Sequence, residues 1–177
     1  MLALDLETTG FDPRAAEVLA IGTVPIIDGA IRVGAATSTL VRPEGRSAVE
    51  GIVAHHLRPS DVADAPRLVE VLPDLLDVIE EVDALLVHNA GLDVNVLRRA
   101  CASLELRWPR PPVIDTIDLI NRIRKRERAT GHGRRLPRNL SGARQAFGLP
   151  PHQAHDAVSD AIATAELYLA LQSRLTR

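Results

Sequence analysis

Two acidic residues, Asp5 and Glu7, stand two positions apart inside an apolar run near the start of the chain. On a β-strand, residues i and i+2 project from the same face, so both carboxylates would point one way while Leu4 and Leu6 point into the core. Two close carboxylates repel each other, and Mg²⁺ or Mn²⁺ can compensate because these ions prefer oxygen ligands. Taken alone, the pair is more typical of ordinary acids on a solvent-facing edge strand.

The residues that follow this pair, Thr8, Thr9 and Gly10, mark the exit from the strand. A glycine permits a sharp turn and lets a ligand approach backbone N–H groups without a Cβ in the way. The same residues are also ordinary turn chemistry.

A second group of polar residues, His88, Asn89 and Asp93, follows a short apolar stretch and opens a helical pattern. Asp93 would lie in the first turn of that helix. Aspartate is favoured near a helix N-terminus and Asn89 could itself be a cap, so this group alone does not require a catalytic role.

A third group comprises His155 and Asp160 at the start of the last long helical pattern. If both residues were helical they would be about 140° apart and could not share a site. If Asp156 caps the helix, His155 lies on the preceding loop and its imidazole can turn toward Asp160. The nearby His152 makes a structural metal site with two histidines conceivable, although the spacing is poor.

The three groups occur in this order along nearly the whole chain, as Asp5-Leu6-Glu7-Thr8-Thr9-Gly10, His88-Asn89-Ala90 with Asp93, and Ala154-His155-Asp156-Ala157 with Asp160-Ala161. In this combination the sequence resembles the DEDDh-type 3′–5′ exonucleases of the ribonuclease H-like superfamily. It is most similar to the part of that family that contains the proofreading epsilon subunits of DNA polymerase III. Leu92 is a departure, because the family commonly has Phe before the second-motif aspartate.

The resemblance implies a site with two divalent ions, Mg²⁺ or Mn²⁺, held by Asp5, Glu7, Asp93 and Asp160. Asp5 would bridge both ions, and Asp93 would act partly through water. His155 would be the general base, since an imidazole titrates near neutral pH.

The resemblance further implies that Thr8, Thr9, Gly10 and Asn89 contact substrate. The expected reaction is release of nucleoside 5′-monophosphates from single-stranded or frayed DNA, in replication proofreading or repair. Two alternatives stay open: an exoribonuclease of the ribonuclease T type, and a non-catalytic binding module that keeps the fold. Little follows the last helix, so we expect no polymerase-tethering extension, although a polymerase partner is compatible with the resemblance.

Charge is unevenly distributed along the 177 residues, whose net charge is −2. Residues 122–138 carry eight basic side chains against the single acid Glu127, which indicates a partner with phosphates of its own. From this segment we expect Arg134 and Arg135 to contact substrate phosphates, although a solvated helix end with a loop is the more ordinary interpretation. The lone Cys101 excludes an internal disulfide and is typical of a reducing compartment, so we expect a cytoplasmic protein without a membrane partner.

The elements that must position these groups can be read from hydrophobic spacing. We expect strands at 2–6, 18–27 and 31–41, then short strands at 84–87 and 113–114. Helices are expected at 68–79, 92–104, 116–123, 140–147 and 157–175, with a basic loop after residue 123. This order predicts one α/β domain over 1–177 whose sheet is covered on both faces. The resemblance implies that it is an exonuclease domain with a ribonuclease H-like mixed five-stranded sheet, three antiparallel strands first and then parallel ones, flanked by helices on both faces.

Overall fold

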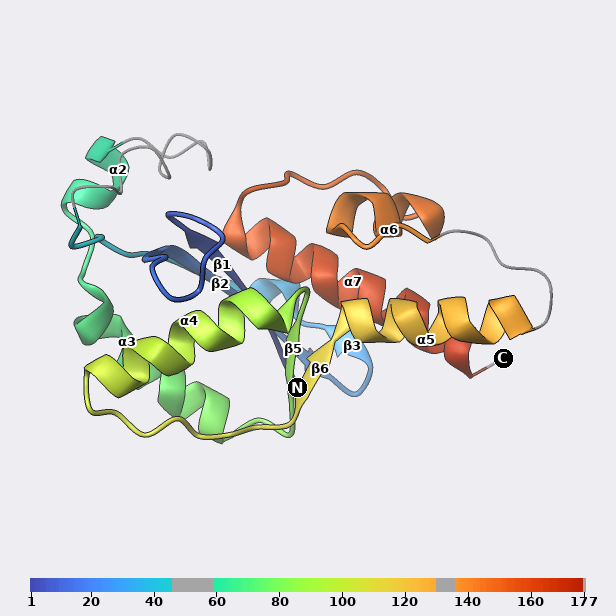
Figure 1. Cartoon of the computed structure of the whole chain (residues 1–177), viewed down its shortest axis with the longest axis horizontal. Helices are drawn as coiled ribbons and strands as arrows, with labels where there is room; N and C mark the ends of the chain where they lie inside the picture. Colours follow the sequence, from blue (N-terminus) through green and yellow to red (C-terminus); the bar gives the residue numbers. More distant parts are fainter. Residues whose placement is uncertain (46–58, 130–135, 177) are drawn as a thin grey trace.

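In a computed structural model, which describes residues 1–45, 59–129 and 136–176, the first strand β1 (Leu2–Thr8) lies in the middle of a mixed sheet (Figure 1). Strand β2 (Val18–Ile27) pairs with it antiparallel on one side. On its other side β5 (Leu85–Val87) pairs parallel, and β6 (Val113–Asp115) pairs parallel with β5. The α/β class and the mixed sheet expected from the sequence are confirmed.

The third antiparallel strand differs from its prediction because it is split. A 3₁₀ turn over Val33–Ala35 divides it into β3 (Ala30–Ile31) and β4 (Thr37–Leu40), and both pieces pair with β2. The extra residues of the turn shift the register between the two pieces, so one continuous strand over 31–41 cannot form.

Side chains alternate across β1 between two hydrophobic cores. Leu2, Leu4 and Leu6 pack into the core that is covered by α3 (Leu68–Glu80) and α4 (Ala90–Ser103). Ala3 packs into the opposite core, which is covered by α5 (Thr116–Ala129), α6 (Leu140–Ala146) and α7 (Ala157–Leu175). Asp5 and Glu7 share the face of Ala3, as the period of two requires, so both acids lie on the α7 side.

Helix α5 extends two turns beyond the predicted end at residue 123. The sequence interpretation assigned residues 124–129 to a basic loop, but this stretch continues the helix. Arginine, lysine and glutamate are good helix formers, so a run of charge does not by itself end a helix. The short helix α2 (Pro59–Ala63) precedes α3. Within the described residues, no helix is long and apolar enough to cross a membrane.

The start of α7 packs directly on the sheet at Gly22. This glycine is the β2 partner of Asp5, and a Cβ built on it would lie 2.1 Å from the carbonyl carbon of Ala157 and 2.4 Å from the nitrogen of Val158. The missing side chain therefore allows the N-terminus of α7 to lie against the strand pair that carries the acids. In Figure 1 the carboxyl end of β1 and the start of α7 lie side by side.

Candidate active site

Three of the predicted acids meet at the carboxyl end of β1. One carboxylate oxygen from each of Asp5, Glu7 and Asp160 lies within 4.8 Å of the others. Glu7 is only 4% exposed and Asp5 is half-buried, so the cluster has little contact with solvent. Oxygen ligands at this separation suit a hard divalent cation, and the donor set therefore fits the ions that the sequence predicted.

Asp93 completes the set of acids from the other side of β1. Its side chain is 3% exposed in the first turn of α4, as the spacing predicted, although it lies outside the group of three within 4.8 Å. Its charge acts on both Asp5 and Glu7, so all four acids share one electrostatic environment.

The burial and proximity of these acids raise the pKa values of Asp5 and Asp93. Burial, then the neighbouring charges of Asp93, Asp160 and Glu7, raises the pKa of Asp5 well above its usual range. Burial also raises the pKa of Asp93, with further contributions from Asp115 and Glu7. Without a compensating cation the cluster is thus a region of unfavourable negative charge.

Two histidines contact Asp160, one through its backbone and the other through its ring. The backbone N–H of His155 donates to Oδ2 of Asp160 at 3.0 Å, and Nε2 of His152 lies 2.8 Å from Oδ1. Burial raises the pKa of Asp160, while these two contacts oppose the rise. Sequence reasoning weighed His152 only as part of a structural metal site, whereas its contact is with the carboxylate that the motif already contained.

The loop conformation of His155 matches its prediction. Asp156 caps α7 by accepting from the backbone N–H of Ser159 at 2.8 Å, and His155 precedes the helix with a positive φ of 65°. Its side chain is exposed, and its charge acts on Asp160. The proximity needed for a base beside the cluster is therefore present.

The residues after β1 form a tight turn, and most of their polar groups make hydrogen bonds within the same loop. The Thr8 hydroxyl donates to the Gly10 carbonyl at 2.8 Å, and Thr9 bonds Glu17 through both its backbone N–H and its hydroxyl. A Cβ on Gly10 would meet nothing within 4 Å. Phe11, which sequence analysis did not single out, is 87% exposed beside this turn.

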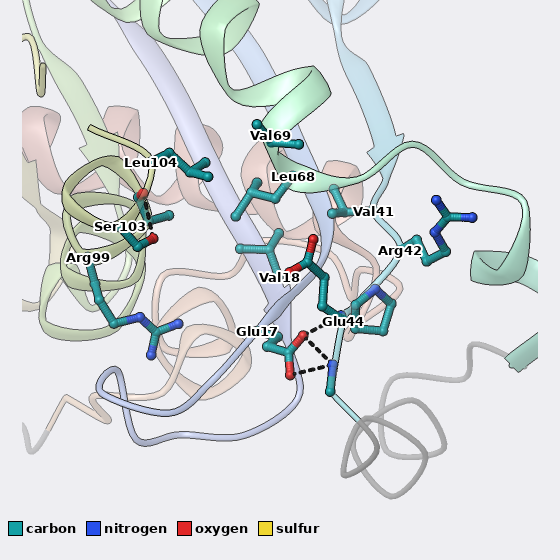
Figure 2. A pocket seen from close by; sticks show the side chains of 13 residues that line it. Glu17, Val18, Val41, Arg42, Glu44, Leu68, Val69, Arg99, Ser103 and Leu104 are labelled. Atoms are coloured by element: carbon teal, nitrogen blue, oxygen red, sulfur yellow. Dashed lines mark hydrogen bonds between the residues drawn. The ribbon is translucent and has the colours of Figure 1, made fainter. Parts of the chain in front are cut away.

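Two side chains anchor this loop from outside. Arg99 of α4 donates to the carbonyls of Pro13 and Ala16. The Glu17 carboxylate accepts from the backbone N–H groups of Glu44 and Gly45. Figure 2 shows both side chains lining a cavity of about 460 Å³, together with apolar residues that include Val18, Val41 and Leu68. Arg99 thus connects the loop to the helix that carries Asp93.

The turn before α4 is held by a carboxylate from the neighbouring strand. Asn89 adopts a left-handed conformation with a φ of 85°, and its side chain makes no cap bond of its own. Instead Asp115, at the end of β6, accepts from the backbone N–H groups of Asn89 at 3.1 Å, Ala90 at 2.9 Å and Ile117 at 2.8 Å. The two contacts to the α4 turn join Asp115 to residues that lie 26 and 25 positions away in the sequence.

Comparison with known proteins identifies the family. An exonuclease family model matches residues 2–168. The chain belongs to this exonuclease family. The family and the enzyme class predicted from the motifs, a nuclease, are thereby confirmed, and a scaffold without catalysis loses its support.

Curated relatives of this exonuclease chain are larger proteins. It is 28% identical over 98% of its length to a protein of Mycobacterium tuberculosis named as a bifunctional exonuclease/endonuclease, of which it covers 26%. It is 31% identical over 95% of its length to a PolC-type DNA polymerase III of Thermotoga petrophila, of which it covers 11%. The chain therefore spans only a part of these relatives.

Solved structures share the fold of the chain. Exonuclease X in complex with 5′ overhanging duplex DNA matches 97% of this chain and 90% of its own, with a TM-score of 0.70 and 24% identity. Exonuclease I of E. coli in complex with a dT13 oligonucleotide matches 99% of this chain and 41% of its own, with a TM-score of 0.80 and 16% identity.

Proposed function

We propose that this chain is a metal-dependent 3′–5′ exonuclease that releases nucleoside 5′-monophosphates from single-stranded or frayed DNA. The observation that carries the proposal is the convergence of Asp5, Glu7 and Asp160 within 4.8 Å, with Asp93 acting on the same charges. Separate elements supply these acids at a large electrostatic cost, which a purely structural site would not require.

Mg²⁺ or Mn²⁺ ions held by Asp5, Glu7, Asp93 and Asp160 would stabilise negative charge on the scissile phosphate and make water a stronger nucleophile. Two ions are proposed, because four carboxylates carry the charge that two divalent cations balance. Asp5, on the central strand, would help to hold both ions.

His155 is the proposed general base. Its position before α7 lies next to Asp160, and its exposed ring can accept a proton from the attacking water and pass it to solvent. The contact of His152 with Asp160 assigns it a different task, which is to orient that carboxylate.

The turn after β1 is the proposed seat of the 3′-terminal nucleotide. Because Thr8 and Thr9 bond within the loop, they shape it, and the open space at Gly10 allows a substrate to approach the backbone. Asn89 would border the same nucleotide from the α4 side, and Phe11 presents an exposed ring on which a base can stack.

DNA is the preferred substrate because the fold neighbours were solved with DNA and the relatives include DNA polymerases. Arg134 and Arg135 lie outside the described residues, and their contact with substrate phosphates remains part of this proposal. A DNA polymerase partner and a cytoplasmic location are proposed on the same basis.

The direct test is release of mononucleotides from a 3′-labelled DNA oligonucleotide in the presence of Mn²⁺. Asp5→Asn should abolish release, because it removes a ligand while keeping the shape of the side chain. Asp28→Asn is the matched control, since Asp28 lies in the β2–β3 turn at the other end of the strand, with a φ of 52° that asparagine tolerates. Full activity of Asp5→Asn would refute the proposal, and a strong preference for a matched RNA oligomer would change the substrate.

A further inference from the structure

The two flanks of the sheet carry opposite charge. Residues 60–83, which include most of α2 and all of α3, contain eight acidic side chains and the single base Arg67. On the other flank, α5 contains five basic side chains and two acids, one of which, Glu127, is paired with Arg174 at 2.9 Å. Figure 1 places α2 and α3 at one end of the molecule and α5 at the other, with the end of β1 between them.

The basic flank contains a hollow of about 540 Å³. Arg124 of α5 lines it together with Arg138 and the neighbouring residues 136, 137 and 139. Arg128 lies one turn further along α5 on the same face as Arg124, and it is exposed. Guanidinium groups at the wall of an open hollow suit phosphate oxygens, which they bind through paired hydrogen bonds.

This hollow is connected to the catalytic edge through His88. The ladders place Ala3 of β1 beside Leu86 of β5, so His88 lies at the same edge of the sheet as the acids. The Nδ1 atom of His88 is 2.7 Å from the Thr116 hydroxyl at the start of α5. One half-buried histidine therefore links the turn before α4 to the first residue of α5, the helix that supplies Arg124 to the hollow.

We propose that this hollow and the adjoining face of α5 bind the backbone phosphates of the strand on the 5′ side of the scissile bond. The proposal rests on the proposed function, because an enzyme that removes the 3′-terminal nucleotide leaves only the 5′ portion of the strand to extend from the site. That portion would be repelled by α3 and attracted by α5. The ligand is thus a polynucleotide backbone, read through its charge rather than through its bases.

The test is a binding measurement that needs no catalysis. A 5′-fluorescent oligothymidylate of about 20 nucleotides is titrated with the protein in EDTA, and its anisotropy is followed at several salt concentrations. The double variant Arg124→Ala/Arg138→Ala should weaken binding on the order of tenfold and lower the slope of log K against log salt by about 1.4, since each phosphate contact on a single strand contributes about 0.7. The loss should shrink for a trinucleotide, which is too short to reach the hollow.

The matched control is Arg107→Ala/Arg110→Ala, which removes the same charge from two exposed arginines. These residues precede β6 and therefore lie toward the opposite edge of the sheet, so the control should bind like the parent. An unchanged affinity and slope in the Arg124/Arg138 variant, or an equal loss in the control, would overturn the proposal. Absence of Mn²⁺-dependent nucleotide release from the parent protein would instead refute the proposed function and leave the binding result standing.

Discussion

The acids at the end of β1 and the acid at the end of β6 lie in opposite electrostatic conditions. Asp93 is buried and Asp5 is half-buried beside other carboxylates, and both have a raised pKa. Asp115 accepts three backbone N–H groups at the N-termini of two helices, where negative charge is favourable. Carboxylates that support the fold are satisfied by the protein itself, whereas burial and the neighbouring acids disfavour the charges of Asp5 and Asp93.

The same distinction extends to Glu17 and Asp156. The Glu17 carboxylate accepts from the backbone of Glu44 and Gly45, and Asp156 caps α7. Glu17 stands ten residues after Glu7, and Asp156 stands four residues before Asp160, yet each is committed to a loop or a helix end. The difference can be tested by substitutions that separate catalysis, positioning and stability.

The largest effect is expected from His155→Ala. Loss of the general base should lower kcat on the order of 10²–10⁴-fold with little change in KM, because the backbone bond from His155 to Asp160 is retained. His152→Gln is the comparison, since it should disturb the orientation of Asp160 and weaken Mn²⁺ binding first. Steady-state kinetics on a DNA oligonucleotide measure kcat and KM of both variants. A larger loss of kcat in His152→Gln than in His155→Ala would make His152 the general base instead.

A smaller effect is expected from Asp115→Ala. Three backbone N–H groups lose their acceptor, so the α4 turn relaxes and Asp93 moves from the cluster. We expect Mn²⁺ affinity and kcat to fall roughly 10- to 100-fold, with Asp115→Asn partly rescuing both because Oδ1 still accepts from Asn89 and Ile117. Calorimetric titration with Mn²⁺ distinguishes this from a purely structural role, in which stability falls while metal affinity stays at the parent value.

Gly22→Ala should lower the stability of the protein and also displace α7. The new methyl group would collide with the backbone at Ala157, so α7 must move away from β2. We expect a loss of about 1–3 kcal/mol in the free energy of unfolding, together with weaker Mn²⁺ binding through displacement of Asp160. Gly34→Ala is the control, because a Cβ there meets nothing within 4 Å. Denaturant unfolding of both variants measures the difference, and equal stability of the two would contradict this account of α7 packing.

The smallest effect is expected on the thermal stability of the metal-free protein. A carboxyl whose pKa is raised by folding binds its proton more tightly in the folded state, so folding is penalised once pH rises above the usual Asp pKa. The penalty is complete above the raised pKa. In EDTA near neutral pH, Asp93→Asn should therefore have a Tm a few degrees above the parent, and this advantage should disappear in acid.

Added Mn²⁺ should raise the Tm of the parent above that of Asp93→Asn, because Mn²⁺ binding stabilises the parent more than it stabilises the variant. Thermal unfolding followed by circular dichroism across pH checks both statements. If the Tm of the parent protein in EDTA at neutral pH equals or exceeds that of Asp93→Asn, the buried charge of Asp93 is compensated within the protein. The contrast with Asp115 would then fail.

Local sequence patterns predicted the faces of β1 and the start of α7 correctly, whereas α4 begins at Ala90, two residues before its predicted start. Alternation along β1 separated Leu4 and Leu6 from Asp5, and Asp156 was assigned as the cap of α7 that leaves His155 on a loop. Both depend on interactions within a few residues, where strand period and capping preferences dominate. The same reasoning ended α5 too early, because it treated the charge of residues 124–129 as a reason for a loop.

The sequence by itself determined which acids the chain carries and the order of the elements that hold them, since residue type and hydrophobic period are local properties. Tertiary structure alone decided that Asp160 lies beside Asp5, that Gly22 makes room for α7, and that Asp115 holds the turn before Asp93. These contacts join residues far apart in the chain, so their geometry follows from how the sheet and helices pack, which no local pattern encodes.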